Sequence, residues 1–105
     1  MENFQTIRVE KGIITYIKLN RPEVHNAMNE LMISDLTRAF NDLPLDTTIR
    51  LIVLQGNGKS FCAGADLNYM KEIAKFGYNE NYNDGLKLAT LFKTIYQCPI
   101  PTIAV

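Results

Sequence analysis

The chain has 105 residues, of which 47% are hydrophobic and 21% are charged, a composition typical of one globular domain with a modest core. Eleven basic residues balance eleven acidic ones, and this net charge of zero argues against binding to nucleic acid or to an anionic membrane surface. No apolar run reaches the ~18 residues of a membrane-spanning helix, and residues 1–5 form neither a basic leader nor an apolar signal core, so we expect a cytoplasmic protein.

The two cysteines and the single histidine do not form a metal-binding motif. Cys62 and Cys98 are not part of a CxxC pair, and His25 is the only histidine of the chain. Zinc is therefore not indicated, and we expect no metal. We expect two reduced thiols, because a cytoplasmic location is expected, and a disulfide between them is the alternative.

Two strands are predicted at the start of the chain. Residues 4–10 and 12–20 are rich in β-branched side chains that alternate in part with polar ones, and Lys11-Gly12 between them indicates a hairpin. Pro22 ends the second strand, because proline cannot donate a hydrogen bond to a neighbouring strand.

A helix and a third strand are predicted next. Apolar side chains recur every three or four positions from Met28 to Leu43, which predicts a helix over residues 29–41 with one buried face. Residues 49–54 are apolar at every position except Arg50, which is typical of a strand that is covered on both faces.

The second half of the chain predicts a short helix, a loop and a long helix. Residues 67–75 have helical character, whereas residues 76–84 contain a glycine and four Asn or Asp residues and predict an irregular loop. The long helix is predicted over residues 84–97. Its core face is expected to contain Leu88, Leu91, Phe92 and Ile95.

The final segment, residues 101–105, is apolar and strand-like, with no polar residues after it. Chain ends are usually exposed and polar, so we expect these 105 residues to be the N-terminal part of a larger protein. The order strand, strand, helix, strand, helix indicates an α/β fold.

The most informative motif lies between the third strand and the short helix. It reads Ala63-Gly64-Ala65, and Asp66 follows as the first residue of the helix. Small residues allow another molecule to approach the backbone, and a helix start presents unpaired N–H groups and a partial positive charge. This pattern favours an oxyanion hole. The alternative is a tight turn that needs small residues only for packing.

Three segments resemble the crotonase superfamily, which contains the enoyl-CoA hydratases and isomerases. They are residues 60–67, residues 17–29 and residues 101–105, and they occur in the family's order and at similar spacing. Residues 66–71 and 96–102 are most similar to the methylglutaconyl-CoA hydratase branch. The resemblance implies the N-terminal part of a ββα superhelix, because members of the family are more than twice as long as this chain.

The resemblance implies that the backbone N–H of Ala65 is one of two oxyanion donors. In the family such a donor holds the thioester oxygen of an acyl-CoA substrate, together with an amide from a glycine that lies beyond residue 105. Addition of water to an unsaturated thioester passes through an enolate-like state with charge on that oxygen, so the donor stabilises the transition state.

The resemblance also implies a binding site for coenzyme A. Ala63 is expected to contact the adenine through its carbonyl, and Asp66 is expected mainly to cap the helix. Met70 is expected either in the acyl pocket or in plain core. The candidate coenzyme A residues are Val24, Ala27, Ala63, Gly64, Ala65, Asp66 and Leu67.

The acid and the base of a hydration reaction are not found in the sequence. In the resembled hydratases two glutamates beyond residue 105 carry out these steps, whereas Glu72 and Glu80 match no family motif and are expected on a solvated face. His25 is expected on a surface loop, and Cys62 is not expected to be a nucleophile. We therefore expect the 105 residues alone to be inactive.

The resulting hypothesis is an enoyl-CoA hydratase-type lyase that acts on an α,β-unsaturated acyl-CoA, most like methylglutaconyl-CoA in leucine degradation. The alternatives are an enoyl-CoA isomerase or another crotonase, an RNA-binding module, and a structural module without a ligand. The sequence contains no basic stripe to favour RNA. The resemblance implies a homotrimer or hexamer and no separate cofactor, because coenzyme A is part of the substrate.

Overall fold

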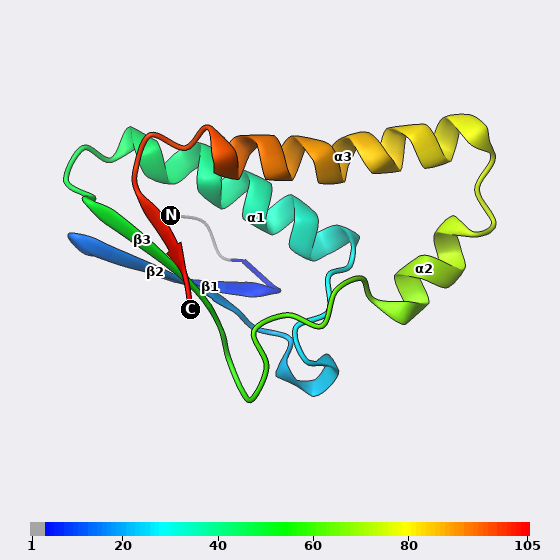
Figure 1. The fold of residues 1–105 in the computed structure, drawn as a ribbon, viewed down its shortest axis with the longest axis horizontal. Coiled ribbons are helices and arrows are strands. Elements are labelled where there is room, and N and C mark those ends of the chain that lie inside the picture. The colour runs from blue at the N-terminus through cyan, green and yellow to red at the C-terminus, as the bar shows by residue number, and fades with distance from the viewer. Residues whose placement is uncertain (1–3) are drawn as a thin grey trace.

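The computed structural model describes residues 4–105, and within them four strands form one mixed sheet in the order β1-β2-β3-β4 (Figure 1). β1 (Ile7–Glu10) pairs antiparallel with β2 (Ile14–Leu19). β3 (Leu51–Gly56) and β4 (Thr102–Ala104) then add in parallel. The predicted hairpin, third strand and final strand are therefore confirmed.

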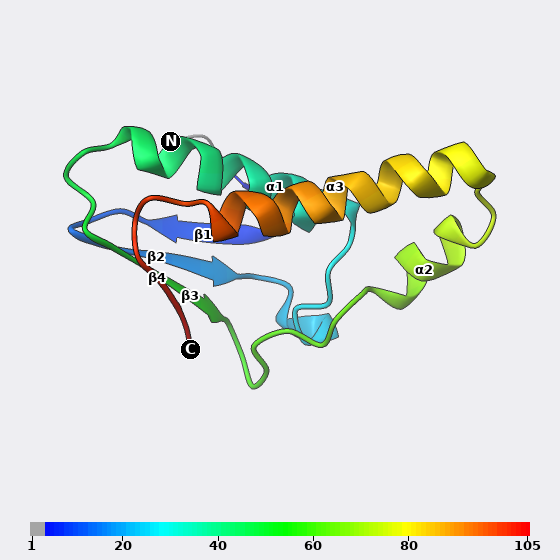
Figure 2. The same ribbon diagram turned by 45° about the horizontal axis from the view of Figure 1, so that its top comes forward.

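The two long helices lie side by side on one face of this sheet (Figures 1 and 2). α1 (Glu30–Asp42) packs on the sheet and α3 (Tyr78–Tyr96) packs along α1, whereas α2 (Leu67–Ile73) lies beyond the sheet, near the start of α3. Short 3-10 helices occupy Pro22–Val24 and Leu43–Leu45. Within residues 4–105 there is no helix with both the length and the hydropathy required to cross a bilayer.

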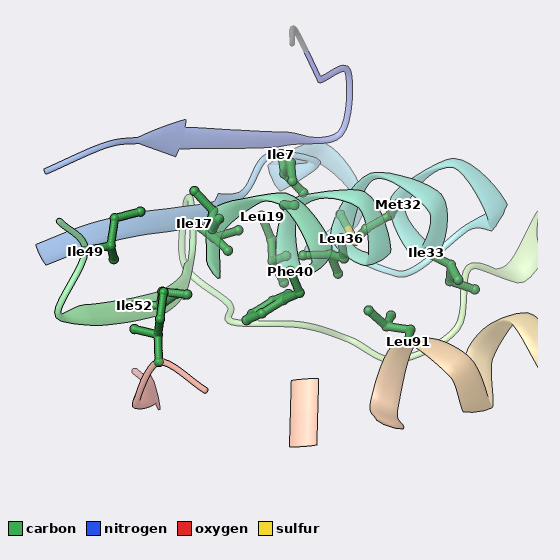
Figure 3. Packing of buried hydrophobic residues seen from close by; sticks show 13 residues of the cluster. Ile7, Ile17, Leu19, Met32, Ile33, Leu36, Phe40, Ile49, Ile52 and Leu91 are labelled. Atoms are coloured by element: carbon green, nitrogen blue, oxygen red, sulfur yellow. The ribbon is translucent and has the colours of Figure 1, made fainter. Parts of the chain in front are cut away.

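The core lies between the sheet and α1 (Figure 3). Every second residue of β2 points into it, so Thr15, Ile17 and Leu19 are buried while the residues between them stay partly exposed. On α1 the buried stripe follows the helical period, as predicted from the sequence. Its members are Met32, Ile33, Leu36, Ala39 and Phe40.

β3 differs from the expectation that both of its faces are covered. Ile52 is fully buried, but its neighbours along the strand are only half-buried. The reason is that α1 and α3 lie on the same side of the sheet, which leaves the other side without a covering helix among the described residues (Figure 2).

The predicted loop over residues 76–84 is wrong. α3 begins at Tyr78 with Gly77 as its N-cap, so helix replaces almost all of that segment. The rings of Tyr78 and Tyr82 lie one turn apart and stack with centroids 6.5 Å apart, and the Tyr69 hydroxyl of α2 donates a hydrogen bond to Asp84. These contacts stabilise a turn that composition alone does not favour.

One residue of the predicted core face of α3 is also misplaced. Phe92 is 57% exposed, whereas Leu91 is fully buried and Leu88 and Ile95 pack against the core. At 100° per residue, Phe92 lies at the edge of the stripe formed by the other three side chains, and at that edge it faces solvent.

Candidate functional site

Two loops meet where the parallel strands β2 and β3 end. Leu19 of β2 pairs with Gly56 of β3, so residues 20–28 and residues 57–66 leave the sheet side by side (Figure 1). The carboxyl ends of parallel strands are a common place for ligand sites in α/β proteins, because neighbouring loops converge there. Both loops carry residues that the sequence singled out.

The two loops are joined through their backbones. The N–H of Met28 donates to the Gly64 carbonyl at 2.7 Å, and the N–H of Asp66 donates to the Met28 carbonyl at 2.8 Å. A third bond runs from the N–H of Ala63 to the His25 carbonyl at 3.0 Å. Together they form a short parallel pairing that is centred on Met28 and Ala65.

This pairing leaves the N–H of Ala65 without a partner. Both hydrogen bonds of this parallel bridge join Met28 to the residues on either side of Ala65. The N–H of Ala65 itself therefore points away from the Met28 segment. Within residues 4–105 no group accepts a hydrogen bond from the Ala65 N–H, and the residue is exposed. The structure therefore presents this N–H to the surroundings.

A groove of about 580 Å³ lies over this segment, and we call it the Ala65 groove. Six of the seven residues expected to bind coenzyme A line it, together with two polar residues of α2 that the sequence reasoning missed. Its lining is Val24, Ala27, Ala63, Ala65, Asp66, Leu67, Asn68 and Lys71. Lys71 follows Leu67 by four residues, so the two side chains share one face of a helix. This spacing could have predicted that Lys71 lies beside Leu67 in the groove.

Gly64, the seventh expected residue, shapes the segment through its backbone. Its φ is +94°, a conformation that side chains with a Cβ rarely adopt. A Cβ built on Gly64 would meet no atom within 4 Å, so the space over it is open. The glycine is thus required by the backbone conformation, and it also leaves room for a ligand.

Asp66 is the N-cap of α2, as expected. Its Oδ1 accepts from the Tyr69 N–H at 3.0 Å, and its Oδ2 accepts from Arg21 Nη2 at 3.1 Å. The Tyr69 N–H, and after it the Arg21 guanidinium, hold the pKa of Asp66 below its ordinary value against the opposing effect of burial. Asp66 is therefore an ionised carboxylate at neutral pH and holds the turn together, because Arg21 also donates to the Ala27 carbonyl.

The remaining candidates lie outside the groove lining. Met70, predicted for the acyl pocket, is about half exposed and does not line the groove, so its role stays a prediction. His25 is exposed, as expected for a loop residue, although its Nδ1 lies 3.2 Å from the Ser60 hydroxyl. Glu72 and Glu80 are exposed, as predicted, although Glu80 lies on α3 and not in the predicted loop.

A second cavity, also of about 580 Å³, lies between the start of α1 and α2. Glu30, Asp66 and Glu72 contribute carboxylates to it, and Arg21 and Tyr69 complete much of its polar wall. Its acidic lining repels an anionic oxygen, and the free Ala65 N–H is not part of it. We therefore place the candidate site in the Ala65 groove.

The fold and the sequence both match known proteins. A crystal structure of an enoyl-CoA hydratase from Shewanella pealeana superimposes with a TM-score of 0.93 at 32% identity, over 96% of this chain and 38% of that one. The fold is thus that of the crotonases. Residues 9–105 match the family model for enoyl-CoA hydratase/isomerase, and the chain belongs to this family.

Two further relatives show how much of the family's length is represented. A Thermus thermophilus protein that is named among the enoyl-CoA hydratases is 41% identical over 98 residues, which cover 93% of this chain and 39% of that protein. The 1,2-epoxyphenylacetyl-CoA isomerase of Escherichia coli is 44% identical over 68 residues, 65% of this chain and 26% of that protein. The chain thus spans about two fifths of the length of the Shewanella and Thermus proteins.

Proposed function

We propose that the protein that carries this chain adds water to an α,β-unsaturated acyl-CoA thioester, and that methylglutaconyl-CoA, an intermediate of leucine degradation, is its substrate. The observation that supports the proposal is the free N–H of Ala65 at the wall of an open groove. Charge develops on the thioester oxygen as water adds, and one positioned donor contributes roughly 2.7–4 kcal/mol to stabilising that charge.

The groove supplies a surface that suits coenzyme A. Val24, Ala27 and Leu67 are apolar and line one continuous depression, which fits the pantetheine arm. The Ala63 carbonyl is our candidate acceptor for the adenine amino group. Lys71 adds a cation at the same depression, and an ammonium group suits the phosphates of the cofactor moiety.

The acid and the base of the proposed reaction belong to another part of the protein. Asp66 is the carboxylate in the groove lining, and its bonds to Arg21 and to the Tyr69 N–H leave it ionised and engaged. We assign the acid, the base and the second oxyanion amide to residues beyond Val105. The trimeric or hexameric assembly and the cytoplasmic location stay predictions.

The test is the variant Ala65→Pro in the complete protein that carries this chain. Proline removes the N–H that points away from the Met28 pairing and keeps the bonds that the neighbouring residues make. We expect kcat for crotonyl-CoA or methylglutaconyl-CoA to fall on the order of 10²–10³-fold. Binding of free coenzyme A, which has no thioester oxygen, should change much less.

The control is Ala65→Gly, which keeps the N–H and removes only a methyl group. This variant should retain most of kcat. Proline also restricts Gly64, so circular dichroism and a melting curve must show that Ala65→Pro is folded. A folded Ala65→Pro protein with near-normal kcat would mean that Ala65 serves only for packing.

Enoyl-CoA isomerisation, which moves the double bond, is the second candidate, and the description of the matching family model, enoyl-CoA hydratase/isomerase, includes both reactions. Both reactions place negative charge on a thioester oxygen, so both need the same donor. Incorporation of ¹⁸O from labelled water into the product distinguishes them, because hydration adds a water oxygen and isomerisation does not.

A further inference from the structure

The side chain of Asn26 is fully buried between the two loops, and the sequence reasoning did not single it out. Its Oδ1 accepts from the Arg21 N–H at 2.8 Å. Its Nδ2 donates to the carbonyls of Asn57 and Ser60, both at 2.9 Å. One amide therefore uses both of its N–H bonds and joins three points of the backbone.

The backbone on either side of Asn26 makes the bonds that hold the oxyanion segment. The preceding residue, His25, accepts from Ala63, and two residues later Met28 pairs around Ala65. Asn26 itself has a φ of +58°, a left-handed conformation that asparagine tolerates better than most residues. Side chain and backbone thus fix the same two loops at adjacent points.

Taking the proposed function as its basis, we propose that Asn26 is a positioning residue, which sets the place of the Ala65 N–H relative to the acyl-CoA groove. Asn26 does not line the groove. It acts by fixing the distance between residues 20–28 and residues 57–66. Asn57 and Ser60 are half-buried residues, and without the two Asn26 donors their carbonyls need water as a partner. Water between the loops would move residues 57–66 away from residues 21–28, and the donor would move with them.

Two variants test this role in the complete protein. Asn26→Asp keeps the size, the left-handed backbone and the acceptor for the Arg21 N–H, but it directs an oxygen at two carbonyl oxygens. Asn26→Gly keeps the backbone conformation and removes all three side-chain bonds. The matched control is Asn29→Ala at the N-cap of α1, directly after the same loop, which removes only the cap that accepts from the Met32 N–H at 2.9 Å.

Two readouts report the position of the donor. The first is steady-state kinetics with crotonyl-CoA, in which a displaced oxyanion donor lowers kcat more than it raises KM. The second is the infrared carbonyl frequency of bound butyryl-CoA labelled with ¹³C at the thioester carbon. A hydrogen bond to the thioester oxygen lowers this frequency, and the measurement does not depend on turnover.

We expect kcat to fall about 10–10²-fold in both Asn26 variants, with a much smaller change in KM. The bound carbonyl frequency should return toward that of the free thioester. Asn29→Ala should lower the melting temperature but leave kcat and the frequency unchanged.

Three results would overturn the proposal. The first is that the Asn26 variants fold and have wild-type kcat and carbonyl frequency. The second is that kcat and the carbonyl frequency change equally in the Asn29 control. The third is that both Asn26 variants fail to fold. A wild-type protein that neither turns over crotonyl-CoA nor shifts the carbonyl of butyryl-CoA would instead refute the proposed function itself.

Discussion

Four of the described residues have a positive φ, and all four lie in the two loops of the candidate site. They are His25, Asn26, Gly58 and Gly64. Two of them are not glycine, and holding such residues in a left-handed conformation costs free energy, which the surrounding hydrogen bonds must offset. Backbone conformations of this kind concentrate at functional sites, which agrees with the placement of the Ala65 groove.

A comparison of two glycine variants separates backbone strain from lost space. Gly64→Ala and Gly85→Ala both place a methyl group where no atom lies within 4 Å, but only Gly64 has a positive φ. We expect Gly64→Ala to lower the free energy of unfolding by about 1–2 kcal/mol, and to weaken acyl-CoA binding. Gly85→Ala lies inside α3 and should raise the free energy of unfolding by about 0.5–1 kcal/mol. Denaturant titration of both variants measures the difference, and the same sign in both would contradict the argument.

At the site, the sequence located the segment that carries the donor but not what holds it. Ala63, Gly64 and Ala65 stand out because small residues directly precede a helix. The bonds from the Asn26 amide nitrogen to Asn57 and Ser60, and the pair formed by Arg21 with Asp66, join residues that are 31 to 45 positions apart. Such contacts depend on β2 and β3 being neighbours, and no local pattern reports that.

At the scale of the elements, α2 depends on contacts outside itself. It has seven residues, none of them buried, so little apolar burial stabilises it. The Asp66 cap holds its start, and the hydrogen bond from Tyr69 to Asp84 holds it to α3. Burial and the neighbouring Asp84 carboxylate raise the pKa of Tyr69, so the phenol stays protonated and remains a donor at neutral pH.

Removing that hydrogen bond should loosen α2 without disturbing the core. In Tyr69→Phe we expect the amides of Leu67–Ile73 to exchange about tenfold faster, since a hydrogen bond to a charged group contributes about 1.5–3 kcal/mol. Tyr82→Phe is the control, because that exposed ring stacks on Tyr78 and its hydroxyl makes no hydrogen bond within residues 4–105. Hydrogen exchange followed by mass spectrometry measures both variants. Unchanged exchange in Tyr69→Phe would show that the cap alone holds α2.

Sequence patterns predicted the elements well where a buried face imposes its period. α1 and the three parallel strands begin and end within a few residues of the predicted positions. The first turns of α3 were missed because they have no buried face and are rich in asparagine. Their helical conformation rests on the stacked tyrosines and on the bond to α2, which become visible only in three dimensions.

Over the whole molecule, many of the exposed large apolar side chains belong to three elements or directly follow them. These elements are α2, α3 and β4, and β4 is one of the two edge strands of the described sheet. This set of exposed side chains favours association, because large exposed apolar patches often mark protein interfaces. Its members are Leu67, Met70, Tyr78, Tyr82, Leu86, Phe92, Tyr96, Ile103 and Val105.

We therefore expect a polypeptide of residues 1–105 to self-associate, or to melt at a lower temperature than a longer form of the protein. The exposed side chains and the free edge of β4 promote association between copies. Sedimentation velocity over a range of concentrations, together with thermal melting of both forms, measures this. A monomeric, cooperative melt as high as that of the longer form would contradict the prediction.

The pairing of Met28 with Ala65 has a consequence for protein engineering. Its hydrogen bonds are made entirely by backbone atoms, so they do not depend on which side chains line the groove nearby. Val24 and Ala63 can therefore be varied in a library to alter how the groove holds the coenzyme A moiety in the proposed function, while the amide of Ala65 keeps its direction. In the proposed function, binding of coenzyme A and stabilisation of charge are then separable, and the first can be changed by selection without rebuilding the donor.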